Sequence, residues 1–175
     1  MRKIEETLTQ YAAYHRDRRN IATHFVGIPM IVFAVVLALA TATITVGPMA
    51  VTMAAIVSIV ACIYYFLLDR VFGLTMAVVL FAMCAAASEI TARMTTGATL
   101  GIAGLVFVVG WALQFLGHKF EGMKPAFFDD VKQLLVGPLF VCAEIAFAFG
   151  ARGELRSRIE AHVGPTVARR APWPA

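Results

Sequence analysis

The sequence predicts an all-α integral membrane protein. The expected bundle has four spanning helices, a fifth re-entrant or spanning helix and a short N-terminal interfacial helix. Sixty per cent of the 175 residues are hydrophobic and only 15% are charged, whereas a soluble domain carries roughly 25% charged residues. The apolar residues also gather in long uncharged runs, which are typical of helices surrounded by lipid.

The first element is expected within residues 2–19, RKIEETLTQYAAYHRDRR, which are polar and of mixed charge. Ile4, Leu8, Tyr11 and His15 recur there at helical spacing on one side. This pattern predicts a short helix that lies at the membrane surface or in the cytosol.

Four uncharged runs follow, each with the length of a membrane span. They are Phe25–Val46, Met49–Leu68, Val71–Ser88 and Met94–Gly117, with 22, 20, 18 and 24 residues. A spanning helix needs about 20 residues, and roughly 17–25 are observed. A Gly47-Pro48 turn signal separates the first two runs, and charged residues separate the others. Each run is therefore predicted to cross the membrane.

A fifth run, Leu134–Ala151, contains Gly137-Pro138 and Glu144. Basic residues favour the cytoplasmic side, so the basic N-terminus and, after four spans, residues 118–132 are expected in the cytoplasm. A fifth crossing would place the five arginines of residues 152–175 outside, which favours a re-entrant or interfacial segment over a span. We expect residues 1–151 to form one membrane-embedded catalytic domain, and residues 152–175 to form a basic, loosely ordered tail.

A polar stripe marks the end of the fourth run. Trp111, Gln114, His118 and Glu121 fall within an arc of roughly 80° on a helix. A histidine and a glutamate three residues apart can bind one metal ion, as in di-iron bundles. The same stripe is also compatible with an interfacial belt in which tryptophan and histidine anchor the helix end.

Two further histidines, His15 and His24, are nine residues apart and would point to opposite faces of one continuous helix. A break near residues 18–20 would let both face one pocket, at the membrane depth expected for His118. Three neutral imidazoles with open positions suit iron, zinc or copper. The fourth histidine, His162, belongs to the arginine-rich tail and is expected to be exposed to solvent.

Several other charged residues have two interpretations each. Glu144 is costly to bury in an apolar run, so it pairs with an arginine or hydrogen-bonds a ligand histidine. Asp69 pairs with Arg70 or orients a histidine. Lys124 and Arg19 either bind a carboxylate or an acidic headgroup, or are ordinary basic residues of the cytoplasmic side.

Several function classes have no support in the sequence. It contains no P-loop, H-E-x-x-H, C-x-x-C or G-x-S-x-G motif. The net charge of +4 lies at the chain ends and in short loops, which indicates membrane topology and gives no reason to expect nucleic-acid binding. The spans lack deep charged residues, which argues against an ion channel.

Three stretches resemble the Mpo1-like family, also known as DUF962. They are YHRDRRNIATHFVGIP, WALQFLGHKFEGMKPA and GPLFVCAE, and together they extend over most of the chain. The resemblance implies an Fe(II)-dependent dioxygenase that performs α-oxidation of 2-hydroxy fatty acids and releases CO2 and an acid one carbon shorter. It implies His15, His24 and His118 as iron ligands, with Glu121, Gln114 and Asn20 as catalytic candidates and Glu144 as a further motif residue.

This activity agrees with the physical interpretation, because the acyl chain of such a substrate belongs in lipid while its headgroup can chelate a metal. The expected partners are therefore a 2-hydroxy fatty acid, O2 and membrane lipids. The expected location is the bacterial inner membrane, or the endoplasmic reticulum of a eukaryote, with the site facing the cytoplasm. A zinc-dependent membrane lipid hydrolase and a non-enzymatic membrane adaptor remain as alternatives, and the sequence leaves a homo-oligomer open.

Overall fold

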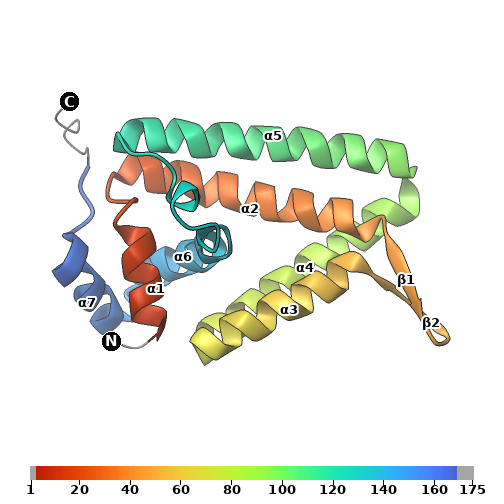
Figure 1. Cartoon of the computed structure of the whole chain (residues 1–175), viewed down its shortest axis with the longest axis horizontal. Coiled ribbons are helices and arrows are strands. Elements are labelled where there is room, and N and C mark those ends of the chain that lie inside the picture. The colour runs from red at the N-terminus through yellow and green to blue at the C-terminus, as the bar shows by residue number, and fades with distance from the viewer. Residues whose placement is uncertain (1–2, 169–175) are drawn as a thin grey trace. The chain divides into compact units, whose positions relative to one another are not determined.

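The computed structural model describes residues 3–168 and confirms an α-helical membrane-protein fold. Figure 1 shows the elements in chain order: α1 (Lys3–Ala12), α2 (Arg18–Ala40), β1 (Thr43–Val46), β2 (Met49–Thr52), α3 (Met53–Leu68), α4 (Arg70–Arg93), α5 (Thr96–Glu121), the 3-10 turn η1 (Ala126–Phe128), α6 (Gln133–Ala148) and α7 (Gly153–Val163). Within the described residues, α2, α4 and α5 are long and apolar enough to cross a membrane.

The first two apolar runs differ from the expected pair of spans. The run Phe25–Val46 is helical only as far as Ala40, and the run Met49–Leu68 begins as a strand. Helix α3 keeps 16 residues, which rise about 24 Å, less than the hydrocarbon core of roughly 30 Å.

A β-hairpin accounts for this difference. Strands β1 and β2 pair antiparallel, with Thr43 opposite Thr52 and Val46 opposite Met49. The predicted Gly47-Pro48 turn joins them, and Gly47 has a φ of 61°, which glycine adopts at little cost. β-branched residues on both sides of the turn favour extended backbone. The turn therefore joins two paired strands, whereas the sequence predicted that it would join two helices.

The fifth apolar run becomes α6, and an element that was not predicted follows it. Helix α7 lies within residues 152–175, the stretch expected to be loosely ordered, of which residues 169–175 are outside the described part. The axes of α6 and α7 are bent by 114°. This bend fits either a broken span or a re-entrant segment, so the choice between them stays a prediction.

The chain divides into two compact units. One contains the residues up to Ile28 and from Trp111 onward, and the other contains Pro29–Gly110. Whether residues 1–151 act as one catalytic domain stays a prediction.

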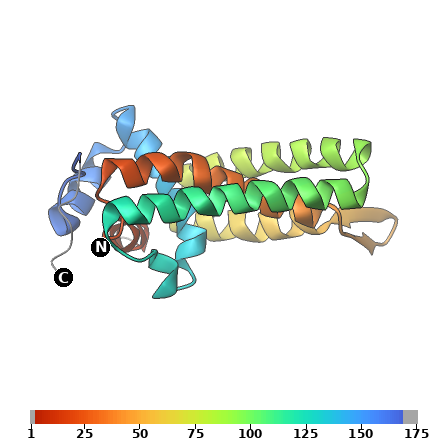
Figure 2. The same ribbon diagram turned by 90° about the horizontal axis from the view of Figure 1, so that it is seen from above.

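In the unit of residues 29–110, α3 and α4 lie side by side as a helical hairpin (Figures 1 and 2). Their close approach depends on Gly73, where an added Cβ would lie 2.6 Å from the Cα atom of Phe66. Many of their large apolar side chains are exposed, including Leu67 and Phe81 at 77% and 76%. Such surfaces suit lipid rather than water.

In the other unit, α1 packs against α6 and α7. The predicted apolar face of α1 is confirmed, because Ile4, Leu8 and Tyr11 are buried. Leu139 and Phe140 of α6 are also buried in this unit, and Phe140 lies against the Tyr11 ring. This packing fixes the end of α1, after which the chain carries the first histidine of the site.

Candidate metal centre

A break between two helices positions the first two histidines. Helix α1 ends at Ala12 and α2 begins at Arg18, so the predicted break exists and lies slightly earlier than expected. His15 lies in the connecting segment and His24 on the second turn of α2. His118 comes from the last turn of α5.

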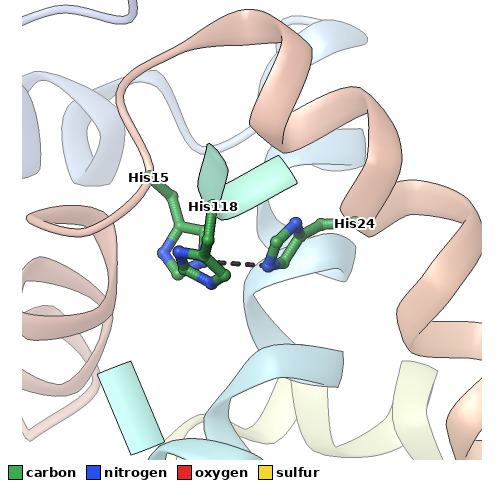
Figure 3. Close-up of side chains that lie close together, drawn as sticks. All are labelled: His15, His24 and His118. Carbon is green, nitrogen blue, oxygen red and sulfur yellow. Dashed lines mark hydrogen bonds between the residues drawn. The ribbon is translucent and has the colours of Figure 1, made fainter. Parts of the chain in front are cut away.

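The three imidazoles converge, as Figure 3 shows. The ring centroids are 4.5 Å apart for His15 and His24, 5.0 Å for His15 and His118, and 5.1 Å for His24 and His118. One nitrogen from each ring lies within 4.8 Å of the others. The structure therefore brings together the three residues that the sequence analysis selected, while their role as metal ligands stays a prediction.

All three rings are buried, with exposed fractions of 0%, 1% and 6%. Burial, together with the neighbouring His24 and His118, lowers the pKa of His15 well below its ordinary value. The ring is therefore neutral at physiological pH and carries an unprotonated nitrogen. Neutral imidazole is the form that binds metals.

The tautomers of His15 and His24 follow from their backbone contacts. Nδ1 of His15 lies 2.7 Å from the carbonyl oxygen of Tyr11, and Nδ1 of His24 lies 2.9 Å from that of Asn20. A carbonyl oxygen only accepts, so both Nδ1 atoms carry the proton and both Nε2 atoms are acceptors in the neutral rings.

These two Nε2 atoms lie only 3.0 Å apart, the contact that is dashed in Figure 3. Two acceptor lone pairs at this distance repel one another unless a proton or another cation lies against them. Burial opposes protonation. A metal cation would satisfy both nitrogens, so the donor set fits a metal centre.

Unsatisfied polar atoms accompany the histidines. Nδ1 of His118, Nε2 of Gln114 and Oδ1 of Asn20 are buried without a hydrogen-bond partner among the described residues. Such atoms are rare in folded proteins and call for a ligand, ion or water. Gln114 lies four residues before His118 on α5, and Asn20 lies four residues before His24 on α2. A metal ion or polar headgroup bound at the histidines would therefore be close to these atoms.

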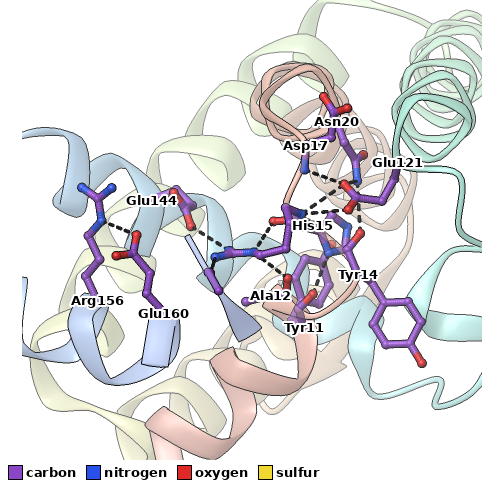
Figure 4. Close-up of polar contacts among 12 residues, drawn as sticks. Tyr11, Ala12, Tyr14, His15, Asp17, Asn20, Glu121, Glu144, Arg156 and Glu160 are labelled. Carbon is purple, nitrogen blue, oxygen red and sulfur yellow. Dashed lines mark hydrogen bonds and ion pairs between the residues drawn. The ribbon is translucent and has the colours of Figure 1, made fainter. Parts of the chain in front are cut away.

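Glu121 ties α5 to the segment that carries His15 (Figure 4). Its Oε1 accepts from the backbone N–H of Arg16 at 3.0 Å, and its Oε2 accepts from the N–H groups of Arg16 and Asp17 at 3.1 and 2.9 Å. The side-chain amide of Asn20 donates to Oε2 at 3.0 Å. The carboxylate therefore holds the His15 segment, in addition to any part in catalysis.

Gly117 permits α5 to approach α2 closely beside the histidines. A Cβ atom at this position would clash with the Thr23 hydroxyl and the Asn20 side-chain oxygen, and would lie 3.1 Å from Nδ1 of His24. A residue without a side chain is therefore required one position before His118.

The remaining predicted residues have clear structural partners. Arg19 pairs with Asp17 at 2.6 Å and lies over the Phe120 ring, while Lys124 pairs with the exposed Asp129 at 2.5 Å. Glu144 pairs with Arg16 at 3.8 Å, which agrees with the interpretation that it pairs with an arginine. Whether Arg19 and Lys124 bind a substrate carboxylate stays a prediction.

Asp69 belongs to the other compact unit. Its Oδ1 accepts from the N–H groups of Val71 and Phe72 at 3.0 and 3.1 Å, so it caps the start of α4. This cap is a structural function that needs no histidine, and the expected orientation of a histidine by Asp69 stays a prediction.

Sequence reasoning missed two neighbours of His15. The Tyr11 ring stacks on the His15 ring, with centroids 4.1 Å apart and planes 2° from parallel. Buried Arg16 donates from Nε to the carbonyl oxygens of Ala12 and His15, each at 2.9 Å. The four-residue spacing of Tyr11 and His15 could have indicated the stack, whereas Arg16 was counted only as a topology signal.

The segment that follows α7 also holds the His15 segment, and we call residues 164–168 the C-terminal strap. The N–H of Val167 donates to the carbonyl of Arg16 at 2.8 Å, and the N–H of Arg18 donates to the carbonyl of Val167 at 2.9 Å. Nη1 of Arg16 donates to the carbonyl of Gly164 at 3.0 Å. The two backbone bonds form a parallel bridge between Asp17 and Val167.

Comparison with known proteins places this chain in a family. The model of the family described as 2-hydroxy-palmitic acid dioxygenase Mpo1-like matches residues 1–149. The chain belongs to the Mpo1-like family. In this Mpo1-like chain, the three histidines and Glu121 lie inside the matched range, while α7 and the C-terminal strap lie beyond it.

A curated relative supports the same assignment. The Mpo1-like chain is 30% identical over 159 residues to the 2-hydroxy-palmitic acid dioxygenase MPO1 of Saccharomyces cerevisiae. The alignment covers 90% of this chain and 87% of the yeast protein. No solved structure matches the chain.

Proposed function

We propose that the chain is a membrane-bound Fe(II)-dependent dioxygenase that performs α-oxidation of 2-hydroxy fatty acids. The observation that carries the proposal is the buried cluster of His15, His24 and His118 in a chain of the Mpo1-like family. The yeast relative is named for a dioxygenase acting on 2-hydroxy-palmitic acid. The three imidazoles would hold the iron.

The reaction balances without a further reductant. A 2-hydroxy acid and O2 give the fatty acid one carbon shorter, CO2 and water, so the substrate itself supplies the electrons. Bound Fe(II) would supply the means of activating O2 and a Lewis acid for the carboxylate and α-hydroxyl of the substrate.

The protein prepares its own ligands for this task. The carbonyl oxygens of Tyr11 and Asn20 fix the tautomers of His15 and His24, leaving each Nε2 free to bind the metal. Glu121 fixes the backbone of residues 16 and 17 and so the position of His15. His15 and His24 are therefore positioned without iron, which reduces the entropic cost of binding.

Two buried polar atoms are the best candidates for orienting the substrate. Nε2 of Gln114 can donate to a carboxylate, and Oδ1 of Asn20 can accept from the α-hydroxyl. Both lack hydrogen-bond partners among residues 3–168. Glu121 retains a candidate role in proton transfer, although its two oxygens already accept four hydrogen bonds.

The site is proposed to face the cytoplasm, in a bacterial inner membrane or in the endoplasmic reticulum of a eukaryote. The support is the charge pattern, because basic residues favour the cytoplasmic side. The N-terminal segment carries Arg2, Lys3, Arg16, Arg18 and Arg19. The acyl chain would then remain in the bilayer while its headgroup reaches the histidines.

The test is to purify the full chain anaerobically, measure its metals by elemental analysis, and follow O2 uptake with 2-hydroxyhexadecanoate. We expect iron in the preparation, substrate-dependent O2 uptake and release of pentadecanoate. Hexadecanoate, which lacks the hydroxyl group, is the matched control and should give no product. Uptake that is independent of substrate would refute the oxygenase, and hydrolysis with zinc alone would favour the hydrolase.

A further inference from the structure

A cavity lies on a side of α2 that differs from the side of the histidines, in the same compact unit. Its volume of about 310 Å³ is near the lower end of the range for ligand pockets. It is lined by residues of α2, α6 and α7 and by Thr166 of the C-terminal strap. Ile21 and Phe147 are buried in its wall, whereas Ala22 and Ala148 are exposed. Small side chains at these exposed positions leave the groove open.

The groove is separate from the candidate metal centre. On α2, Arg18, Ile21, Ala22 and Phe25 fall within roughly 100° of one another, whereas the directions of Asn20 and His24 are centred roughly 130° away. Among residues 3–168, those that line the groove include no histidine. A ligand in the groove would therefore not need to contact the imidazoles.

The charges around the groove leave one cation without an acidic partner. Glu144 is paired with Arg16 at 3.8 Å. Arg156 is paired with Glu160 at 2.8 Å, as Figure 4 shows. Arg18 is exposed and makes no side-chain hydrogen bond or ion pair within residues 3–168. The groove thus combines an apolar wall with one uncompensated positive charge.

Arg18 is also the first residue of a candidate membrane span. Arginine side chains at such helix ends lie at the level of the lipid headgroups, where their alkyl parts contact apolar surface. A ligand that matches this position has an anionic end at the membrane surface and an apolar chain that lies deeper.

We propose that the groove binds a long-chain fatty acid, with the carboxylate at Arg18 and the acyl chain along Phe25 and Phe147. A single monoanionic carboxylate matches the single uncompensated arginine, and a single acyl chain matches the small volume of the groove. A chain longer than the groove continues into the surrounding lipid. This site does not depend on the proposed dioxygenase activity.

The test measures binding of radiolabelled hexadecanoate to the purified full chain in lipid nanodiscs, under anaerobic conditions. Hexadecanoate lacks the 2-hydroxyl group that the proposed reaction requires, so no turnover occurs, and the groove variants separate binding in the groove from binding at the histidines. Ala148→Phe fills the groove and should weaken binding at least tenfold, whereas Ala85→Phe, at an exposed position on α4, should leave it unchanged. If Ala148→Phe does not fold, Ala22→Phe serves the same purpose.

The charge is tested separately. Arg18→Gln should weaken hexadecanoate binding about tenfold, and Arg70→Gln is the matched control because Arg70 begins the candidate span α4. Hexadecan-1-ol should bind more weakly than the acid and should not respond to Arg18→Gln. The proposal is wrong if filling the groove leaves hexadecanoate binding intact, if the alcohol binds as well as the acid, or if the groove retains a phospholipid that hexadecanoate does not displace.

Discussion

The unit of residues 29–110 exposes large apolar side chains along α3 and α4, whereas the unit with the histidines buries polar ones. Of the 12 buried polar or charged residues in the described chain, only Ser58 and Thr99 lie within residues 29–110, which leaves the other ten in the histidine-bearing unit. The first unit therefore resembles a structure whose solvent is lipid. The second resembles the interior of an enzyme.

This difference indicates which amino-acid substitutions each unit tolerates. A lipid-facing helix is specified mainly by length and hydropathy, so many apolar residues can replace one another at its surface. The buried polar cluster is specified by directed hydrogen bonds, and the loss of one partner leaves a buried group unsatisfied. Matched substitutions in the two units, or at buried and exposed positions, should therefore differ sharply.

The largest contrast is expected between the buried and the exposed histidines. His24→Ala removes one Nε2 from the cluster, so bound iron and product formation should each fall by more than about 100-fold. His162→Ala, on the exposed surface of α7, should change neither. Elemental analysis and a product assay measure both outcomes, and the metal-centre proposal is refuted if His24→Ala retains iron and turns over normally.

The second contrast concerns two glutamates. Glu121→Gln replaces a carboxylate that accepts four hydrogen bonds with an amide that has one acceptor oxygen and would present its NH2 group to backbone N–H donors. We expect iron affinity to fall about 10–100-fold and the free energy of unfolding to fall by about 2 kcal/mol.

The matched control is Glu89→Gln, which removes an exposed ion pair with Arg93 in the other unit and should change stability by less than about 1 kcal/mol. Metal titration and thermal unfolding separate the two roles considered for Glu121. If Glu121→Gln keeps iron affinity and stability but loses turnover, Glu121 acts in proton transfer rather than in holding the His15 segment.

The sequence predicted the lipid-facing helices well because their signal is local. Long uncharged runs identify α4 and α5 without knowledge of any neighbour. The hairpin at Thr43–Thr52 was missed because apolar β-branched residues fit a lipid-compatible helix as well as a strand. The α7 helix was missed because its arginines and glutamates were counted only as a basic tail, although i,i+4 pairs such as Arg156–Glu160 support a helix.

The candidate site was predicted only in part, for a related reason. The histidines and Glu121 stood out because polar residues are rare in this chain. Their supporting contacts join residues that are far apart in sequence, such as Glu121 with Arg16 and Arg16 with Val167. No local pattern indicates such pairs. The tautomers of His15 and His24 likewise depend on which backbone carbonyls the rings reach in the folded chain.

A smaller contrast is expected between two glycines of α5. Gly117→Ala introduces a Cβ into the space occupied by Asn20 and Thr23, which should destabilise the protein by about 1–3 kcal/mol. At Gly101, nothing lies within 4 Å of an added Cβ, so Gly101→Ala should stabilise the helix by up to about 1 kcal/mol. Thermal unfolding of both variants measures the difference, and equal shifts would show that α2 and α5 do not approach closely at Gly117.

The smallest effect is expected at the C-terminal strap, where two substitutions of the same residue, Val167, are compared. Val167→Pro removes the N–H that donates to the carbonyl of Arg16, at a cost of about 1 kcal/mol. Val167→Ala keeps both backbone bonds and trims a side chain that is already 38% exposed. Because the strap contacts the residues that flank His15, Val167→Pro should lower iron affinity a few-fold while Val167→Ala leaves it unchanged. Equal affinities in the two variants would mean that the hydrogen bond from the Val167 N–H to Arg16 is not needed to hold His15.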